Sequence, residues 1–390
     1  MKALSRHVWA MALVAAQAGA VALSWWHLTR LERVEPGQPP PQRWPTVSVI
    51  IPARNEEQRL PALLQSLSSL GYSPMEVLVV DDHSTDGTTA VASAFPVRLV
   101  RGEPLPPGWT GKNFACWQGA TVATGEWLLF MDADTEHAPG MLHAVVSMAV
   151  DRRLAMLSLL PQQRCETFWE RLLLPFAYQQ YVTGMGPPVR RSTAGVANGQ
   201  YILCTASSYR AVGGHAAVRK SVIDDVALAQ RYERHRLPTT LARGEKVASV
   251  RMYQGLNDIA AGFGKNSFRF LLADPASGML VMIATILASL PTGLLVFSAV
   301  LRRSSLFKLG MAGYVVCALG IVPWLRLFGV SPALAFLHPL GAAVFQGIAM
   351  RSAWQTVTGQ RTTWKGRLVG GKETPSPRPT QPLIVTAPGS

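Results

Sequence analysis

The hydrophobic positions of this chain follow two different patterns. In the first half, short apolar runs alternate with stretches whose apolar residues recur at helical spacing. VSVIIPA precedes NEEQRLPALLQSLSSL, and MEVLVVDDHSTDGTTAVASAF repeats that order with a strand at 76–80 and a helix from about Gly87. WLLFMDAD supplies a third predicted strand. Strands that alternate with helices predict a mostly parallel sheet, with its ligand site at the carboxyl ends of the strands.

Longer apolar segments form the second pattern. Residues 8–26 carry no charge and have about the length that a helix needs to cross a bilayer. They end at Trp25 and Trp26, an aromatic edge typical of a membrane interface, whereas a cleaved signal peptide would be shorter and would end in small residues. We therefore favour an uncleaved anchor. Three further membrane helices are predicted at 276–301, 307–325 and 331–350.

These patterns divide the chain into five parts. The Pro-rich stretch VEPGQPPPQRWP is too stiff to join a helix or a central strand. The end of the chain is basic and then rich in Pro, Thr and Ser, which predicts disorder beyond Gly370. The predicted parts are a transmembrane anchor (1–30), a linker (31–46), an α/β domain (47–270), C-terminal transmembrane helices (271–350) and a tail (351–390).

Composition agrees with a membrane protein. Charged residues make up only 15% of the chain, well below the share of about 25% in soluble domains. The net charge is +14, but the arginines are dispersed rather than interleaved with aromatic residues on one face, so we expect no nucleic-acid partner. The cysteines are far apart and form no CxxC pair, which predicts reduced thiols in apolar surroundings at Cys116, Cys165, Cys204 and Cys317.

Two groups of acidic residues follow predicted strands. Asp81 and Asp82 end the second strand and point toward the ligand crevice, although Asp82 or Ser84 could simply cap the next helix. Asp132 and Asp134 follow the third strand, and in an extended segment they lie on the same side. Two converging carboxylates repel each other unless a cation lies between them, and Mg²⁺ or Mn²⁺ suits such a pair. A lone DxD often occurs by chance, but its position after a buried strand favours a metal site.

The motifs carry a resemblance. VSVIIPARNEE, VLVVDDHSTDGT and GEWLLFMDADTE, in that order and spacing, resemble the family 2 glycosyltransferases of the GT-A fold. PPGWTGKNFACWQGA, RCETFWERLLLPFAY, GVANGQYILCTASSYRAVGGH and VIDDVALAQR are similar to a narrower group, which contains hopanoid-biosynthesis-associated and carotenoid-acid (diaponeurosporenoate-type) glycosyltransferases. The match covers roughly 45–270. It implies an α/β, Rossmann-like GT-A domain with one N-terminal and about three C-terminal transmembrane helices.

The resemblance also implies roles for individual residues. Lys112 matches a basic residue near the diphosphate, where its ammonium would offset leaving-group charge; the alternative is a solvated surface lysine. The residues that the resemblance assigns to the nucleotide-sugar site are Pro52, Ala53, Asn55, Glu56, Asp81, Asp82, Lys112, Asp132 and Ala133.

The same resemblance predicts the catalytic base. In the family, this is an Asp in an acidic pair that follows a Gly-Gly turn and opens a helix. Here Gly213 and Gly214 precede Asp224 and Asp225, so Asp225 is the candidate base, with Asp224 where the family often has Glu. Both acids would also be favourable in the first turn of a helix, which is the competing interpretation.

Two further stretches bear on the reaction. GLNDIAAGFGKNSF lacks the QxxRW motif of processive members, while its Lys265 and Asn266 resemble the narrower group, which favours transfer of one sugar per cycle. TFWERLLLPFAYQQYVTGMGPP is either a buried core helix or an interfacial segment, near 166–188, that brings an amphiphilic acceptor to the site.

We therefore expect an inverting, metal-dependent transfer of a single sugar from a UDP-sugar to a hydrophobic isoprenoid or lipid acceptor at the cell (inner) membrane. The alternatives are a processive polysaccharide synthase and a non-catalytic sugar-nucleotide-binding membrane protein. With a cytoplasmic catalytic domain, four crossings would put the basic tail outside, against the positive-inside tendency. Either the tail breaks that rule or one late segment is re-entrant, with 271–301 and its Pro291 as the suspect.

Overall fold

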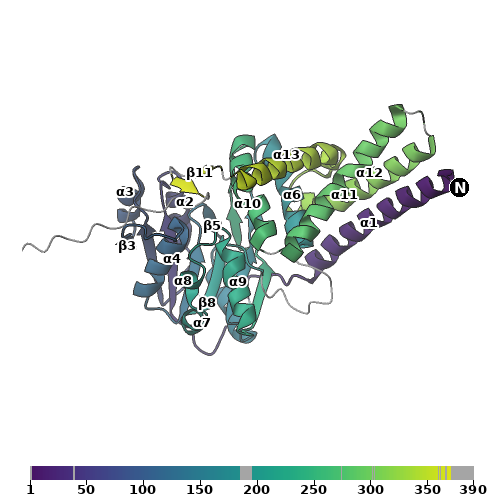
Figure 1. Ribbon diagram of the computed structural model, residues 1–390. Coiled ribbons are helices and arrows are strands. Elements are labelled where there is room, and N and C mark those ends of the chain that lie inside the picture. Colours follow the sequence, from purple (N-terminus) through teal and green to yellow (C-terminus); the bar gives the residue numbers. More distant parts are fainter. Residues whose placement is uncertain are drawn as a thin grey trace, which may run out of the picture.

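A seven-stranded sheet forms the centre of the α/β part of the molecule (Figure 1). The computed structural model describes residues 2–37, 40–184, 196–273, 275–300, 302, 304–358, 360, 362–364 and 367–369. The strand order is β3-β2-β1-β4-β8-β6-β9. Its strands are β1 (Val47–Ala53), β2 (Met75–Asp81), β3 (Arg98–Arg101), β4 (Trp127–Met131), β6 (Met156–Leu160), β8 (Tyr201–Thr205) and β9 (Thr239–Arg243).

The sheet is mostly parallel, as predicted. β3, β2, β1 and β4 are parallel neighbours, and only β8 runs antiparallel, to β4 and to β6. The β1–β2 register pairs Ala53 with Asp81, so the loops after both strands start at the same edge of the sheet. That edge is where an open α/β sheet binds its ligand. The predicted fold class is therefore confirmed.

Short helices cover the seven-stranded sheet. A smaller sheet of three strands, in the order β5-β10-β7, lies at its edge. The helices of this part are α2 (Leu60–Ser68), α3 (Thr88–Ser93), α4 (Gly111–Val122), α5 (Met141–Asp151), α7 (Ala206–Ala211), α8 (Gly214–Ala217) and α9 (Asp224–Arg234). The small sheet consists of β5 (Thr135–His137), β7 (Gln162–Gln163) and β10 (Ala248–Val250), and it fixes the segment that follows Asp134.

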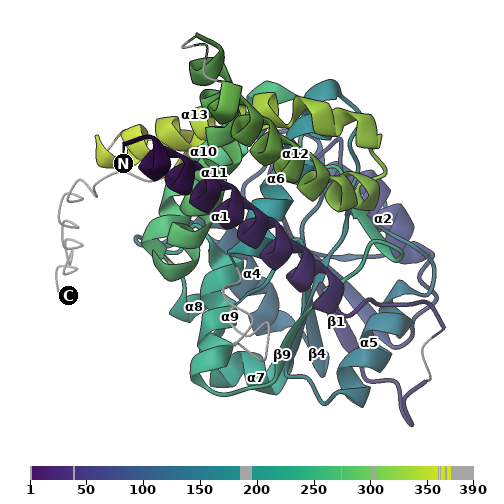
Figure 2. The same cartoon turned by 90° about the vertical axis from the view of Figure 1, so that its right-hand side faces the viewer.

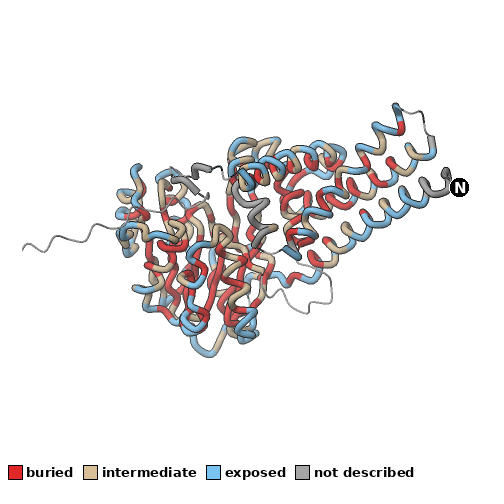
Figure 3. Tube along the Cα trace, viewed as in Figure 1, coloured by how far each residue is buried: buried red, intermediate tan, exposed pale blue. Residues whose placement is uncertain are grey.

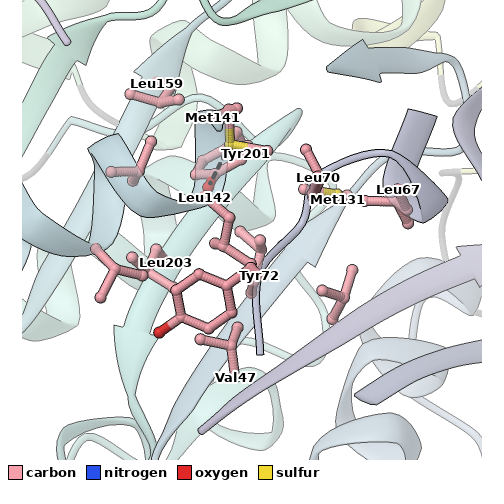
Figure 4. Close-up of a cluster of buried hydrophobic side chains, with 14 of the residues drawn as sticks. Val47, Leu67, Leu70, Tyr72, Met131, Met141, Leu142, Leu159, Tyr201 and Leu203 are labelled. Carbon is pink, nitrogen blue, oxygen red and sulfur yellow. Dashed lines mark hydrogen bonds between the residues drawn. The ribbon is translucent and has the colours of Figure 1, made fainter. Parts of the chain in front are cut away.

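Apolar side chains from β1, β4, β8 and the helices α2 and α5 fill one face of the sheet (Figure 4). Val47, Met131 and Leu203 are almost fully buried there, because alternate strand residues point to the same face. The Tyr72 hydroxyl in this cluster donates to the Pro45 carbonyl oxygen over 2.7 Å, which satisfies its buried polar group. The close packing of both faces holds the ends of the strands in register for the site.

Long apolar helices extend from the α/β part (Figures 1 and 2). In the described part of the chain, four segments are long and apolar enough to cross a membrane, one N-terminal and three C-terminal, as expected: Met11–Arg30, Gly278–Val300, Ser305–Leu327 and Pro332–Val357. They belong to α1 (Lys2–Arg30), α11 (Pro275–Val300), α12 (Ser304–Leu327) and the η1–α13 unit (Pro332–Leu337 and His338–Val357). Much of their outer surface is exposed although it is apolar (Figure 3), which fits contact with lipid.

Two helices join the α/β part to these long helices. α10 (Leu256–Ala273) packs against α11 and α13, and α6 (Phe168–Thr183) packs against α1, α11, α12 and α13. α6 begins with a capping box of Thr167 and Glu170, and most of its side chains are buried. This burial fits the core-helix alternative for that stretch, although its predicted end at 185–188 lies outside the described residues.

Several predicted boundaries differ from the observed ones. The helix after β1 begins at Leu60 rather than near Asn55, because Asn55 has a positive φ of 54° and bonds to the loop after β2. The third strand ends at Met131 rather than at Asp134. α13 continues to Val357, and a small hairpin of β11 (Thr362–Trp364) and β12 (Arg367–Val369) follows. The predicted disorder beyond Gly370 lies outside the described residues.

Candidate active site

The loops that follow β1 and β2 are hydrogen-bonded to each other. The Asn55 side-chain oxygen accepts from the Thr85 backbone N–H at 2.8 Å, and the Ser84 hydroxyl accepts from the Asn55 N–H at 3.0 Å. Arg54 donates to the Asp82 carbonyl oxygen at 2.6 Å. The paired loops thereby form a rigid polar wall at the carboxyl edge of the sheet. Of the predicted nucleotide-site residues, Pro52, Ala53, Asn55, Glu56 and Asp82 line a common cavity at this edge.

Asp81 lies differently from its neighbour. Its carboxylate accepts from the Ser84 N–H of the following loop at 3.0 Å and from the hydroxyl of Thr89 in α3 at 3.2 Å. It is not among the described residues that line the cavity. Neither Asp82 nor Ser84 is the N-cap residue of α3, which is Gly87, and the N–H of Thr88 in the first turn donates to Asp86 Oδ1 at 3.0 Å. Asp81 therefore shapes the loop, and Asp82 lies on the cavity wall.

The DxD segment also reaches the cavity, but by a turn. After β4 the chain leaves the strand, and the Thr135 hydroxyl donates to the Asp132 carbonyl oxygen at 2.9 Å. The expectation of an extended segment with period-two side chains is therefore wrong here. The turn nevertheless brings Asp132, Ala133 and Asp134 to the same cavity. The sequence located these residues correctly at the strand end and gave the wrong local geometry.

Lys112 lies at the start of α4, opposite the DxD turn. Thr110 is the N-cap of this helix and its hydroxyl accepts from the Asn113 N–H. The Lys112 ammonium nitrogen lies 2.7 Å from Asp132 Oδ1 and 3.9 Å from Asp224 Oδ2. It thus bridges the DxD turn to the acidic pair, unlike a solvated surface lysine.

Asn113 holds the start of α4 against the segment that leads to the acidic pair. Its fully buried amide nitrogen donates to the carbonyl oxygens of Val218 (2.9 Å) and Ser221 (3.0 Å). The Thr110 backbone N–H donates to the Arg219 carbonyl oxygen at 2.8 Å. These bonds fix Lys112 relative to Asp224. Sequence reasoning missed Asn113, and a polar residue inside the apolar face of a helix was the available signal.

Asp224 and Asp225 open α9, as predicted. Asp225 Oδ2 accepts from the Gly199 N–H and Oδ1 accepts from the Val226 N–H, both at 2.8 Å, so the plane of the carboxylate is fixed. A side chain at Gly199 would lie 3.2 Å from the Lys112 ammonium and 3.3 Å from Asp225 Oδ2. A glycine at 199 therefore lets its own backbone, the Lys112 ammonium and the Asp225 carboxylate lie close together. Gly199 was not identified from the sequence, although an Asn-Gly pair such as Asn198-Gly199 is a typical turn signal.

The Gly-Gly turn before this pair is a requirement of the fold. Gly213 and Gly214 have φ values of 81° and 49°, a region that L-residues with side chains rarely adopt. A Cβ at Gly214 would collide with the ring of Tyr209. That ring is fixed, since the Tyr209 hydroxyl contacts His215 Nδ1 at 2.9 Å and accepts from the His215 N–H at 3.0 Å. The turn supports α8, just before the acidic pair.

The charged groups of the site shift one another's pKa values. Burial raises the pKa of Asp225, and the neighbouring Asp224 carboxylate raises it further, to about 6, although Lys112 opposes this. Burial alone would lower the pKa of Lys112, but Asp132 and Asp224 outweigh it and hold that pKa well above the usual lysine value. Asp225 is thus a carboxylate with unusual basicity, and Lys112 is a permanent cation beside it.

A divalent cation fits the DxD turn as a partly open site. The described residues contain no group of three or more His, Cys, Asp or Glu side chains that could hold a metal ion. Asp132 and Asp134 alone would leave most positions of a hard cation to phosphate oxygens and water, which is how Mg²⁺ usually binds. The Lys112 ammonium lies 2.7 Å from Asp132 Oδ1, so a bound cation would share this carboxylate with Lys112.

One large cavity joins the loops after β1 and β2, Lys112, the DxD turn and the acidic pair. Its volume is ≈ 1540 Å³, above the range of about 300–1,000 Å³ usual for small-molecule sites. It begins at the loops after β1 and β2, passes Asp132 and Asp225, and continues between α11 and α13. The membrane part of the lining was not predicted as part of the site. Lys265 and Asn266 have side chains outside the described set, so their role stays a prediction.

A nucleotide-sugar-dependent transferase is the class that this fold and site define. The chain matches the family model "Glycosyl transferase family 2" over residues 48–225. It is 30% identical over 337 residues to the 4,4'-diaponeurosporenoate glycosyltransferase of Staphylococcus aureus, covering 82% of this chain and 87% of that one. The Staphylococcus haemolyticus enzyme of the same name is 32% identical over 231 residues, which cover 57% of this chain and 60% of that one.

A solved structure gives the same fold. The mannosyltransferase PcManGT from Pyrobaculum calidifontis, in complex with GDP-Man and Mn²⁺, superposes with a TM-score of 0.56 at 20% identity, covering 90% of this chain and 99% of that one. This chain is a glycosyltransferase and belongs to glycosyl transferase family 2. Within that family it is similar to the carotenoid-acid glycosyltransferases, so the predicted family is confirmed.

Proposed function

We propose that this enzyme transfers one sugar from a nucleoside-diphosphate sugar to a hydroxyl or carboxyl group of a lipid-like acceptor. The observation that carries the proposal is the convergence of Lys112, Asp132 and Asp225 in one cavity that continues between membrane helices. The staphylococcal relatives are named for a carotenoid acid, which supports an isoprenoid or other lipid acceptor.

Asp225 acts as the base in this proposal. Its carboxylate is fixed by two backbone N–H groups and is basic enough to take the proton of an acceptor hydroxyl near neutral pH. The acceptor oxygen then bonds to the anomeric carbon as the bond from that carbon to the diphosphate breaks. A single displacement of this kind inverts the configuration. Asp224 sustains the basicity of Asp225 and anchors Lys112.

Lys112 and the DxD turn act on the leaving group. The Lys112 ammonium offsets the charge that the departing diphosphate gains. A divalent ion held by Asp132 and Asp134, Mg²⁺ or Mn²⁺, would supply Lewis-acid stabilisation of the same group. The nucleotide base and ribose would lie against Pro52, Ala53 and the loop residues after them. UDP is the proposed nucleotide by the habit of the family.

Substitution of the base tests this proposal. Asp225→Asn keeps the size of the side chain and an oxygen that can accept from the Gly199 N–H, but it removes the proton acceptor. We expect transfer by the purified full chain to fall by about 10²–10⁴-fold, measured as product formed per enzyme, while UDP binding measured by calorimetry is unchanged. A protein that only binds the nucleotide-sugar would show no transfer before or after the substitution. A ladder of long products would indicate the processive alternative.

The membrane arrangement follows from the same proposal. A nucleoside-diphosphate donor is cytoplasmic, so the α/β part is placed on that side of a cell membrane. α1, α11 and α12 pack alongside one another, whereas α13 crosses their direction (Figures 1 and 2). α11 is an unbroken helix from Pro275 to Val300, so it is a poor candidate for re-entry. We infer that α13 lies in the membrane without completing a crossing.

This arrangement returns the basic tail to the cytoplasmic side, in agreement with the positive-inside tendency. We assign to the lipid-facing surface the exposed large apolar residues of the η1–α13 unit, which are Phe336, Leu337, Leu340, Met350, Trp354 and Val357. Alkaline phosphatase fused after Gly370 is expected to be inactive, and a fluorescent protein fused there is expected to fluoresce. An active phosphatase would show that all four helices cross.

A further inference from the structure

The membrane end of the cavity is lined by a regular stripe on one helix. The stripe residues of α11 recur at spacings of three and four positions and therefore share one face of the helix. From the first of them to the last, the helix rises about 22 Å, at roughly 1.5 Å per residue. The cavity-lining residues of α11 are Gly278, Val281, Met282, Thr285, Ile286, Ser289, Leu290 and Gly293.

α13 forms the opposite side of this groove. Phe345, Gln346, Ala349, Met350 and Ala353 line it, and the Gln346 amide donates to the Thr285 carbonyl oxygen at 3.1 Å across the two helices. Among the described residues that α11 and α13 contribute, none is charged. The groove therefore suits a hydrocarbon chain and disfavours the charged donor, whose binding groups all lie at the other end of the cavity.

The groove is open to the bilayer along its side. Met282, Ile286 and Leu290 line it and are also 40–46% exposed. Small residues at the far end keep the groove clear: a Cβ at Gly293 would meet nothing within 4 Å. A hydrophobic molecule can thus enter sideways from the membrane. At the near end, a Cβ at Gly278 would collide with the backbone of Leu271, so glycine there lets α10 lie close to α11.

From these observations we propose that the groove between α11 and α13 holds the extended hydrocarbon chain of the acceptor, with its reactive oxygen at Asp225 and its far end near Gly293. The inference rests on the proposed transfer reaction and adds the shape of the substrate. The acceptor is a long, thin chain that reaches about 20 Å into the bilayer side of the cavity, an estimate from the helical rise of the stripe. The groove is continuous with the part of the cavity that Asp225 lines, which favours a substrate over a permanently bound lipid.

A matched pair of variants tests the groove. Gly293→Trp places a large side chain at its far end. Gly347→Trp makes the same change on α13, where Gly347 is exposed, does not line the cavity, and likewise has nothing within 4 Å of a Cβ. Both variants are made in the full chain in phosphatidylcholine nanodiscs, and calorimetric UDP binding checks that each is folded. Unchanged UDP binding separates failure of the groove from failure of the donor site.

The probe is a palmitic acid analogue with a photoreactive diazirine at the end of its chain. Mass spectrometry of the labelled protein is expected to find the label on α11 near Gly293. Labelling should fall at least fivefold in Gly293→Trp, stay unchanged in Gly347→Trp, and be displaced by geranylgeranoic acid, a long isoprenoid acid. Equal labelling of both variants, or displacement by added phospholipid but not by the isoprenoid acid, would overturn the proposal, since it would indicate surrounding or structural lipid.

A kinetic measurement adds a second readout. With an acceptor whose chain fills the groove, Gly293→Trp should raise the acceptor KM about tenfold, which corresponds to about 1.4 kcal/mol, and leave the donor KM unchanged. A short-chain acceptor should not distinguish the two variants. The same loss with short and long acceptors would also overturn the proposal.

Discussion

The two ends of the cavity differ in charge and in how their residues are held in place. At the donor end, side chains from the ends of β1, β2 and β4 and the starts of α4 and α9 are held by backbone hydrogen bonds, and most of them are charged. At the membrane end, one uncharged stripe on α11 faces α13 and is open to its surroundings. The contrast teaches that charge has to be positioned by many fixed contacts, whereas a hydrocarbon chain needs only a surface of the right length and depth.

After loss of the base Asp225, removal of the Lys112 cation is the change that should damage the donor end most. Lys112→Met leaves Asp132 and Asp224 without the ammonium that bridges them, and leaves the diphosphate without its counter-charge. We expect kcat/KM for the donor to fall by about 10²–10³-fold, as when one preorganised group of an active site is lost. Steady-state kinetics measures this. Lys220→Met, an exposed lysine on the segment joined to α4, is the matched control and should change little. Equal effects of the two changes would mean that Lys112 has no special role.

The pH dependence sharpens the comparison, because among the described residues that line the cavity all the charged ones lie at the donor end. Asp225 must be ionised to accept a proton, and its pKa is raised to about 6. Below that pH, kcat/KM is expected to fall by about tenfold per pH unit, which a profile from about pH 5 to pH 8 can measure. Asp224→Asn removes a charge that raises this pKa, so the acid limb should move to lower pH. An unchanged limb in that variant would assign it to another group.

The raised pKa of Asp225 also affects stability, with a pH dependence opposite to that of activity. Between the usual Asp pKa of 3.8 and about 6, folded Asp225 retains a proton that the unfolded chain has released. The free energy of unfolding therefore decreases as the pH rises through this window, and the cost is fully present above it. Asp225→Asn should accordingly be at least as stable as the unsubstituted protein near neutral pH, as thermal unfolding can show, although its rate of sugar transfer is expected to be much lower.

The smallest expected effect concerns the turn that supports the donor end. Gly214→Ala forces a residue with a Cβ into a left-handed conformation and against the Tyr209 ring, at a cost of about 1–3 kcal/mol in the free energy of unfolding. Gly71→Ala is the control, because Gly71 also has a positive φ of 69° but open space around a Cβ. Chemical denaturation of both variants separates the collision from the backbone strain, and equal losses would contradict the collision.

The sequence predicts the parts of the site that depend on local patterns. Strand ends are marked by acidic residues, so Asp82 and Asp132 could be assigned to the carboxyl edge of the sheet. Asp225 opens a helix and was predicted only through the resemblance to the family. The turn at 132–134 could not be predicted, because the Thr135 hydrogen bond that closes it competes with an extended chain.

Features that depend on distant contacts were also out of reach. The bonds from Asn113 to Val218 and Ser221 join segments more than a hundred residues apart. Periodicity shows that α11 is apolar all round but does not reveal which face meets α13. The groove therefore became visible only when both helices were placed in space.

The order of the groups along the chain has a consequence for how such enzymes diversify. Among the described residues that line the cavity, every charged one precedes residue 260, and the groove stripe begins at Gly278. Mutations that reshape the hydrocarbon groove thus fall in a separate stretch of the gene and leave the sugar-transfer machinery intact. An ancestral enzyme of this architecture could acquire a new lipid by drift in its last helices alone, with no intermediate that had lost its chemistry.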